Sequence, residues 1–125
     1  MREDYQPYFR QLKSRITKLG YVSVKEQELY AEFYLHCGWK LCFECERHYG
    51  PMFSLFVVPP SPLNKRKRGY EVGLLMLVFE KLNGKGYGKP TIDTQVDFLI
   101  KERDKVFRDA ALYEAEYSKL SDFAP

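Results

Sequence analysis

The fold is decided by residues 29–58, LYAEFYLHCGWKLCFECERHYGPMFSLFVV, in which apolar and polar side chains alternate. A period of two is typical of half-buried β-strands. Three strands are predicted, at residues 29–35, 39–46 and 53–57. Two turn sequences separate them, Cys37-Gly38 and residues 48–51. Because short turns join antiparallel neighbours, the sequence predicts a three-stranded meander with one buried and one wetter face.

Apolar residues at helical spacing lie both before and after this stretch. Upstream, apolar side chains recur every three or four residues and predict a helix over residues 5–19, which Gly20 ends. Downstream, prolines and basic residues make 59–69 an exposed loop. Residues 70–82 are apolar almost all round, which predicts a helix buried on several sides.

Two further helices are predicted towards the C-terminus. Thr91 is a good N-cap for a helix that extends to about residue 108, and Asp109 begins a last helix. In that last helix Tyr113, Tyr117 and Leu120 share a face. The predicted fold class is therefore α+β, with an N-terminal helix, a three-stranded antiparallel meander, and two or three C-terminal helices packed on the sheet.

Composition predicts one globular domain over residues 1–125. Apolar residues make up 45% and charged residues 30% of the chain, which excludes the compositions of disordered and membrane proteins. The longest apolar run, residues 72–79, is far shorter than the ~20 residues that cross a bilayer. The charged N-terminus leads into no apolar segment, and three cysteines favour free thiols over disulfides. A cytoplasmic location is expected.

Cysteines and histidines cluster in the predicted sheet, at positions His36, Cys37, Cys42, Cys45 and His48. Zinc takes four such ligands, and Cys42-x-x-Cys45 has a familiar ligand spacing. Residues three apart in a strand point to opposite faces, however, so these two thiolates would not converge. The same geometry argues against a redox pair. We therefore expect no metal site, with Cys45 in the core and Cys42 and Cys37 near the surface.

The glycine-rich stretch before Thr91 is an imperfect match to a phosphate-binding loop. Asn83 stands where the first glycine belongs, Pro90 interrupts the Gly-Lys-Thr run, and a helix rather than a strand precedes it. We expect a linker and no bound cofactor.

The net charge of +3 comes from one short run, Lys65, Arg66, Lys67 and Arg68. Without this run, 16 basic and 17 acidic groups remain. The run could contact phosphates, so a nucleic-acid-associated protein is the alternative function. A solvated loop is the simpler interpretation, because nucleic-acid-binding domains usually distribute their basic residues over a whole face.

No catalytic residues are predicted. The chain has two histidines, and none of its serines lies in a Gly-x-Ser-x-Gly motif. Glu44 and Glu46 fall on one strand face with Glu32 on the neighbouring strand, and paired carboxylates can perform acid–base chemistry. With Lys40 nearby they are more simply explained as solvated charges, which leaves an enzyme as the third hypothesis.

Aromatic content favours a binding function. The chain has ten tyrosines, nine phenylalanines and one tryptophan, and several tyrosines fall on outward faces. Tyrosine is enriched at protein interfaces because it offers large, rigid, amphipathic contact area. The wetter face of the first two predicted strands is the predicted partner-binding site. Its residues are Tyr30, Glu32, Tyr34, Lys40, Glu44 and Glu46.

The C-terminal half is similar to segments of small bacterial proteins. The segments are Gly69-Tyr70-Glu71-Val72, Phe79 to Gly84, Gly88-Lys89-Pro90-Thr91, Phe98-Leu99 and Val106-Phe107. Some of these bacterial proteins resemble immunity proteins of toxin–immunity systems. The resemblance implies a non-catalytic cytoplasmic protein that binds a cognate toxin and blocks it. Inhibitors of nucleases tend to be acidic, to match a basic substrate-binding surface, and this chain is not.

Overall fold

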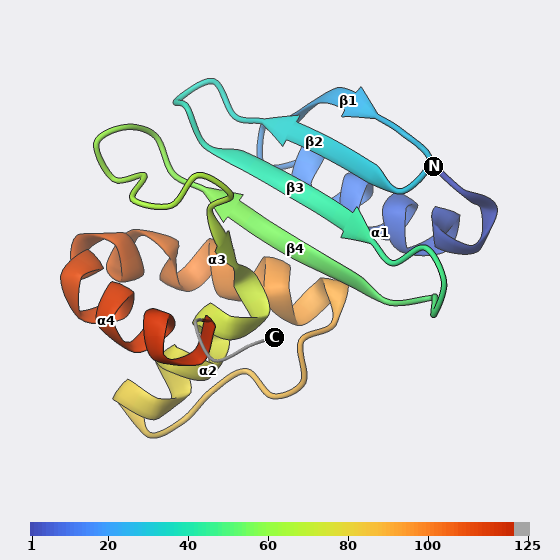
Figure 1. The fold of residues 1–125 in the computed structure, drawn as a ribbon. Helices are drawn as coiled ribbons and strands as arrows, with labels where there is room; N and C mark the ends of the chain where they lie inside the picture. Colours follow the sequence, from blue (N-terminus) through green and yellow to red (C-terminus); the bar gives the residue numbers. More distant parts are fainter. Residues whose placement is uncertain (122–125) are drawn as a thin grey trace. The chain divides into compact units, whose positions relative to one another are not determined.

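A computed structural model describes residues 1–121, and the chain divides into two units, residues 1–71 and residues 72–125 (Figure 1). The first unit contains an antiparallel sheet and the second contains helices, so the α+β class is confirmed. None of the helices within residues 1–121 combines the length and the apolar character needed to span a bilayer.

The sheet of the first unit has five strands that follow one another in sequence order. Every neighbouring pair is antiparallel. The strands are β1 (Val22–Glu26), β2 (Tyr30–Tyr34), β3 (Lys40–Cys45), β4 (Phe53–Val58) and β5 (Tyr70–Glu71). The three predicted strands are confirmed as β2, β3 and β4, but the predicted three-stranded sheet is wrong because β1 and β5 flank them.

The two strands missing from the prediction are the edge strands, and each lacks the sequence pattern from which a strand is predicted. In β1 no residue is buried, so the strand lacks the contrast between buried and exposed positions that marks a half-buried strand. A bulge between Ser23 and Lys25 also breaks its register with β2. β5 has only two residues, and the next helix begins at Val72 rather than at the predicted Tyr70.

The helix α1 (Gln6–Thr17) lies along one face of this sheet, preceded by the 3-10 turn η1 (Glu3–Tyr5) (Figure 1). The Phe9 ring lies 5.9 Å from the Phe33 ring and 6.3 Å from the Phe43 ring, between centroids. The predicted stripe is buried as far as Ile16, whereas Leu19 is exposed because the helix ends at Thr17. Gly20 takes a positive φ of 96° after the helix, as predicted.

The second unit consists of α2 (Val72–Asn83), α3 (Ile92–Arg108) and α4 (Ala110–Ser121). The rings of Phe79, Tyr87 and Phe98 meet edge to face, with centroids 5.4 to 5.9 Å apart. Between helices, the Lys81 ammonium of α2 donates to the Glu116 carboxylate of α4 at 2.6 Å. Aromatic contacts therefore join α2 to α3, and an ion pair joins α2 to α4.

The predicted N-cap of α3 is confirmed. The Thr91 hydroxyl accepts from the Thr94 amide at 3.1 Å, and the Thr94 hydroxyl accepts from the Thr91 amide at 2.8 Å. The helix predicted to be buried on several sides is α2, in which Val72, Leu75, Met76, Val78 and Phe79 are buried while Leu77 is 53% exposed. In α4, Tyr113 and Tyr117 are buried, whereas Leu120, which is predicted to share their face, is exposed near the end of the helix.

Candidate functional site

Five of the six residues predicted to bind a partner lie on the sheet face opposite α1. In the β2–β3 register, Tyr30 pairs with Glu44 and Tyr34 pairs with Lys40, and directly opposed residues point to the same side. Glu32 pairs with Cys42 between them. The alternating residues, including Phe33, face α1. We call the side chains of Tyr30, Glu32, Tyr34, Lys40, Cys42 and Glu44 the outer face.

Charges on the outer face are arranged around Glu32. Its carboxylate lies 3.4 Å from the Lys40 ammonium and 3.9 Å from the Lys25 ammonium, and its side chain is only 13% exposed. Both lysines also lie over tyrosine rings, Lys40 over Tyr34 at 5.7 Å and Lys25 over Tyr30 at 5.6 Å. Two cations around one carboxylate leave this part of the face with a local charge of about +1 at neutral pH.

The outer face also contains the half-buried Tyr30 hydroxyl and the buried Cys42 thiol, which interact with each other. Burial raises the pKa of the Tyr30 hydroxyl far above its ordinary value, and hydrogen bonding with Cys42 and Glu32 raises it further. Burial also raises the pKa of the Cys42 thiol, although Tyr30 and Lys40 oppose this effect. Both groups are therefore neutral at physiological pH, and the thiol is a poor nucleophile.

The other end of the outer face contacts the basic run. The Arg68 guanidinium donates to the Glu44 carboxylate at 2.7 Å and lies over the Phe56 ring at 5.1 Å. Arg66 lies over the Tyr70 ring at 5.9 Å. Lys65 and Lys67 are exposed. Two of the four residues proposed for nucleic-acid binding therefore contact side chains of the sheet.

Glu46, the sixth predicted residue, follows the end of β3 and lines a groove of about 270 Å³ together with Glu44, Phe56 and Arg68. Its carboxylate accepts from the backbone amide of His48 at 3.0 Å, so it also stabilises the turn between β3 and β4.

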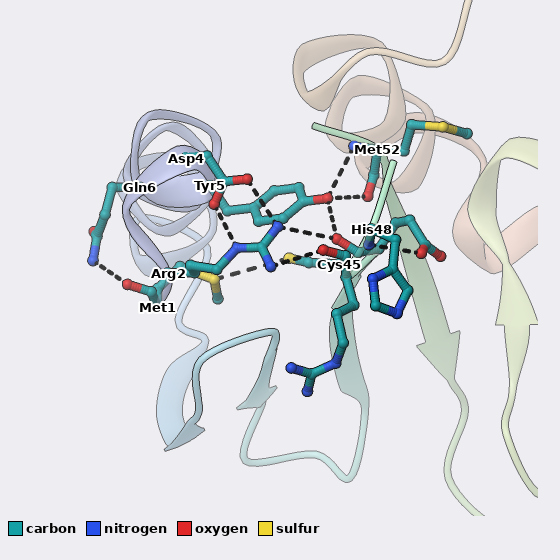
Figure 2. Close-up of polar contacts among 10 residues, drawn as sticks. Met1, Arg2, Asp4, Tyr5, Gln6, Cys45, His48 and Met52 are labelled. Carbon is teal, nitrogen blue, oxygen red and sulfur yellow. Dashed lines mark hydrogen bonds and ion pairs between the residues drawn. The ribbon is translucent and has the colours of Figure 1, made fainter. Parts of the chain in front are cut away.

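That turn is held by a network of N-terminal residues that no sequence pattern predicts (Figure 2). The buried Tyr5 hydroxyl lies 2.6 Å from the Glu46 carbonyl and 2.9 Å from the Met52 carbonyl, and accepts from the Met52 amide at 3.1 Å. Arg2 donates to the Asp4 carboxylate and to the Arg47 carbonyl at 2.9 Å. The hydrogen bond from Arg2 lowers the pKa of Asp4. The network fixes the first helical turns against the β3–β4 turn.

The cysteines do not converge. Cys42 pairs with Glu32 and Phe56, whereas Cys45 pairs with Phe53, so residues 40–45 are a strand that points the two thiols to opposite faces. No group of three or more His, Cys, Asp or Glu side chains within residues 1–121 could hold a metal ion. Burial raises the pKa of Cys45 to about 11, and thiols in this state are poor metal ligands.

The predicted burial of the two strand cysteines is wrong. Cys42 is buried and Cys45 is only half-buried, while Cys37 is exposed as expected. Alternation along β3 correctly separates them, but Cys42 lies at the centre of the sheet between β2 and β4. Cys45 lies at the end of its strand, with its sulfur 3.8 Å from that of Met1.

A larger groove lies where the outer face meets one end of the sheet. Its volume is about 600 Å³, and its lining comes from the start of β1, the β2–β3 turn and the residues after β4. Tyr34 and Lys40 belong to both this groove and the outer face. No sequence motif marks it, because its walls come together only when the sheet forms.

No protein-family model, no curated protein and no solved structure matches the chain. The assignment of a function therefore rests on the residues and their arrangement.

Proposed function

We propose that this chain is a non-catalytic protein-binding module of the cytoplasm, an immunity protein that neutralises a bacterial toxin by direct binding through its outer face. The observation that supports this proposal is the presentation of Tyr30, Tyr34 and alternating charges on one face of an antiparallel sheet. A hydrogen-bonded sheet holds these side chains in place before binding, which reduces the entropy lost on association.

The chemistry of the outer face suits recognition better than catalysis. Each of its carboxylates is ion-paired, Glu32 with lysines and Glu44 with Arg68, so neither is a poised acid or base. Tyrosines flanked by paired charges are typical of interface residues, because the rings supply contact area and the charges select the partner. A partner that complements the Lys25–Glu32–Lys40 cluster would present a carboxylate opposite it.

The proposal is tested by co-expressing the chain with the protein encoded next to it. We expect rescue of growth from the neighbour's toxicity and a stable 1:1 complex in calorimetry. Tyr34→Ala is expected to weaken binding by about 30-fold, the effect of a hot-spot residue. Tyr49→Ala is the matched control, since Tyr49 is also an exposed tyrosine, at 79% exposure, but lies in the β3–β4 turn.

Charge reversal gives a second readout. Lys40→Glu is expected to abolish rescue while the far-UV circular dichroism spectrum stays unchanged. Rescue without a complex, or equal losses in Tyr34→Ala and Tyr49→Ala, would contradict binding through the outer face.

A further inference from the structure

The groove at the end of the sheet has the size of a small-molecule site. Its volume of about 600 Å³ falls within the range of roughly 300 to 1,000 Å³ that is usual for ligand pockets. We call it the end groove and define it by Val22, Tyr34, Leu35, His36, Lys40 and Val58. All of these residues belong to the first unit, so the groove needs no other part of the chain.

Most of the end groove is apolar. Val22, Leu35 and Val58 contribute aliphatic side chains and Tyr34 contributes a ring. Val22 is 62% exposed and Tyr34 is 46% exposed, so the groove leaves apolar surface in water. A ligand with an apolar body would remove that surface from solvent, which is favourable in proportion to the area covered.

The charged part of the end groove is basic. Of its lining residues within the described chain, Lys40 is a cation at neutral pH, His36 is a second nitrogen base, and none is Asp or Glu. Glu32 lies 3.4 Å from Lys40 but is shared with Lys25, so the lysines outnumber the carboxylate. An ammonium has three N–H donors and can therefore bind a ligand oxygen while it keeps its contact with Glu32.

We propose that the end groove binds a small monocarboxylic acid with an aromatic or branched apolar body. The carboxylate accepts from Lys40 Nζ, and the body packs against Tyr34, Val22 and Val58. One fixed ammonium suits a single carboxylate better than a polyphosphate, which requires several cations or a row of backbone amides. This inference goes beyond the proposed function and does not depend on it, because it concerns the isolated chain.

The test is a titration of the ¹⁵N-labelled full chain, followed by amide chemical shifts. The probes are 3-phenylpropanoate, its neutral analogue 3-phenylpropanamide, and acetate. We expect saturable shifts at Leu35, Gly38 and Lys40 with phenylpropanoate, and about tenfold weaker binding for each of the other probes. Equal binding of the amide would overturn the role of the ammonium, and equal binding of acetate would overturn the apolar part of the site.

Two lysines provide a matched pair of variants. Lys40 and Lys25 both approach Glu32, but only Lys40 lines the end groove. Lys40→Met removes the ammonium and keeps an apolar stem, so it is expected to abolish the preference for phenylpropanoate over the amide. Lys25→Met is expected to preserve at least a fivefold preference. Equal losses in the two variants would show that general charge, not a contact in the groove, attracts the acid.

A third variant blocks the groove without changing its charge. Val22→Trp, at an exposed position of β1, is expected to weaken both phenylpropanoate and the amide by at least tenfold. Lys40→Arg retains a cation and is expected to retain the carboxylate preference. If no variant or probe produces saturable shifts in the groove residues, the proposal is wrong.

Discussion

Replacing Tyr5 with phenylalanine removes one oxygen atom from the centre of the N-terminal network. The hydroxyl donates to the Glu46 or the Met52 carbonyl and accepts from the Met52 amide (Figure 2). The Tyr5 side chain is fully buried. Tyr5→Phe leaves the ring and its contact with the Arg2 guanidinium, 5.3 Å from the ring centre, in place. The variant therefore isolates the contribution of the hydroxyl.

The expected loss follows from what the hydroxyl satisfies. A backbone group left without its partner costs about 1–3 kcal/mol when it is buried, and the bonds between the Tyr5 hydroxyl and Met52 are part-buried. The Met52 amide loses its bond to Tyr5, while the Met52 carbonyl still accepts from the Glu46 amide at 2.8 Å. We therefore expect the free energy of unfolding to decrease by about 2 kcal/mol, because the Met52 amide loses its acceptor and the Met52 carbonyl loses one of its two donors.

The assay is urea unfolding followed by tryptophan fluorescence. Trp39 is the sole tryptophan, it is buried, and it belongs to the first unit, so its signal reports on the unit that contains the network. Tyr8→Phe is the matched control from the first turn of the adjoining helix α1, since the Tyr8 ring packs on Phe53 at 5.1 Å between centroids. Its expected effect is below about 0.5 kcal/mol. Equal losses in the two variants would refute the argument.

Three further predictions concern the backbone at two glycines, a helix cap and an ion pair. A Cβ at Gly69, where φ is +78°, would lie 2.5 Å from the Val57 carbonyl oxygen, whereas one at Gly84, where φ is +80°, meets nothing within 4 Å. In urea unfolding followed by circular dichroism, Gly84→Ala is expected to cost about 1–2 kcal/mol and Gly69→Ala clearly more; equal costs would refute the steric argument. Thr91→Ala is expected to cost about 1 kcal/mol in the same assay, with Thr91→Ser close to wild type. The pKa of Glu116 is lowered by hydrogen bonds from two lysines, so its stabilisation is present above the ordinary pKa and is lost as pH falls through the lowered one. Glu116→Gln is therefore expected to melt below wild type at neutral pH and to match it in acid; a gap that persists in acid would contradict this.

Most of the fold prediction depends on the spacing of apolar residues along the chain, because this spacing indicates which positions of a helix or strand are buried. It located β2, β3, β4 and α1, whose buried and exposed positions contrast clearly. It missed β1 because an exposed edge strand has no such contrast. Packing of the C-terminal helices on the sheet, and a single domain over the whole chain, stay predictions.

The candidate site was predictable only where it depends on alternation along one hairpin. Register places Tyr30, Glu32 and Tyr34 on one face, and a period of two is enough to group them. The ion pair between Arg68 and Glu44 joins residues 24 apart in the sequence. No local pattern encodes such a contact, and the same limit applies to the end groove, whose walls come from three separate segments.

Tyr34 and Lys40 contribute to both the outer face and the end groove, and this overlap couples the two proposals. The carboxylate of a protein partner and the carboxylate of a small acid would compete for the same Lys40 ammonium. If binding is mutually exclusive, the acid at ten times its own Kd lowers the apparent affinity for the partner by about tenfold. By the same arithmetic, the partner at ten times its own Kd weakens the apparent affinity for the acid by about tenfold. A partner affinity that does not change with the concentration of the acid would show that the partner binds elsewhere on the chain or leaves the groove open.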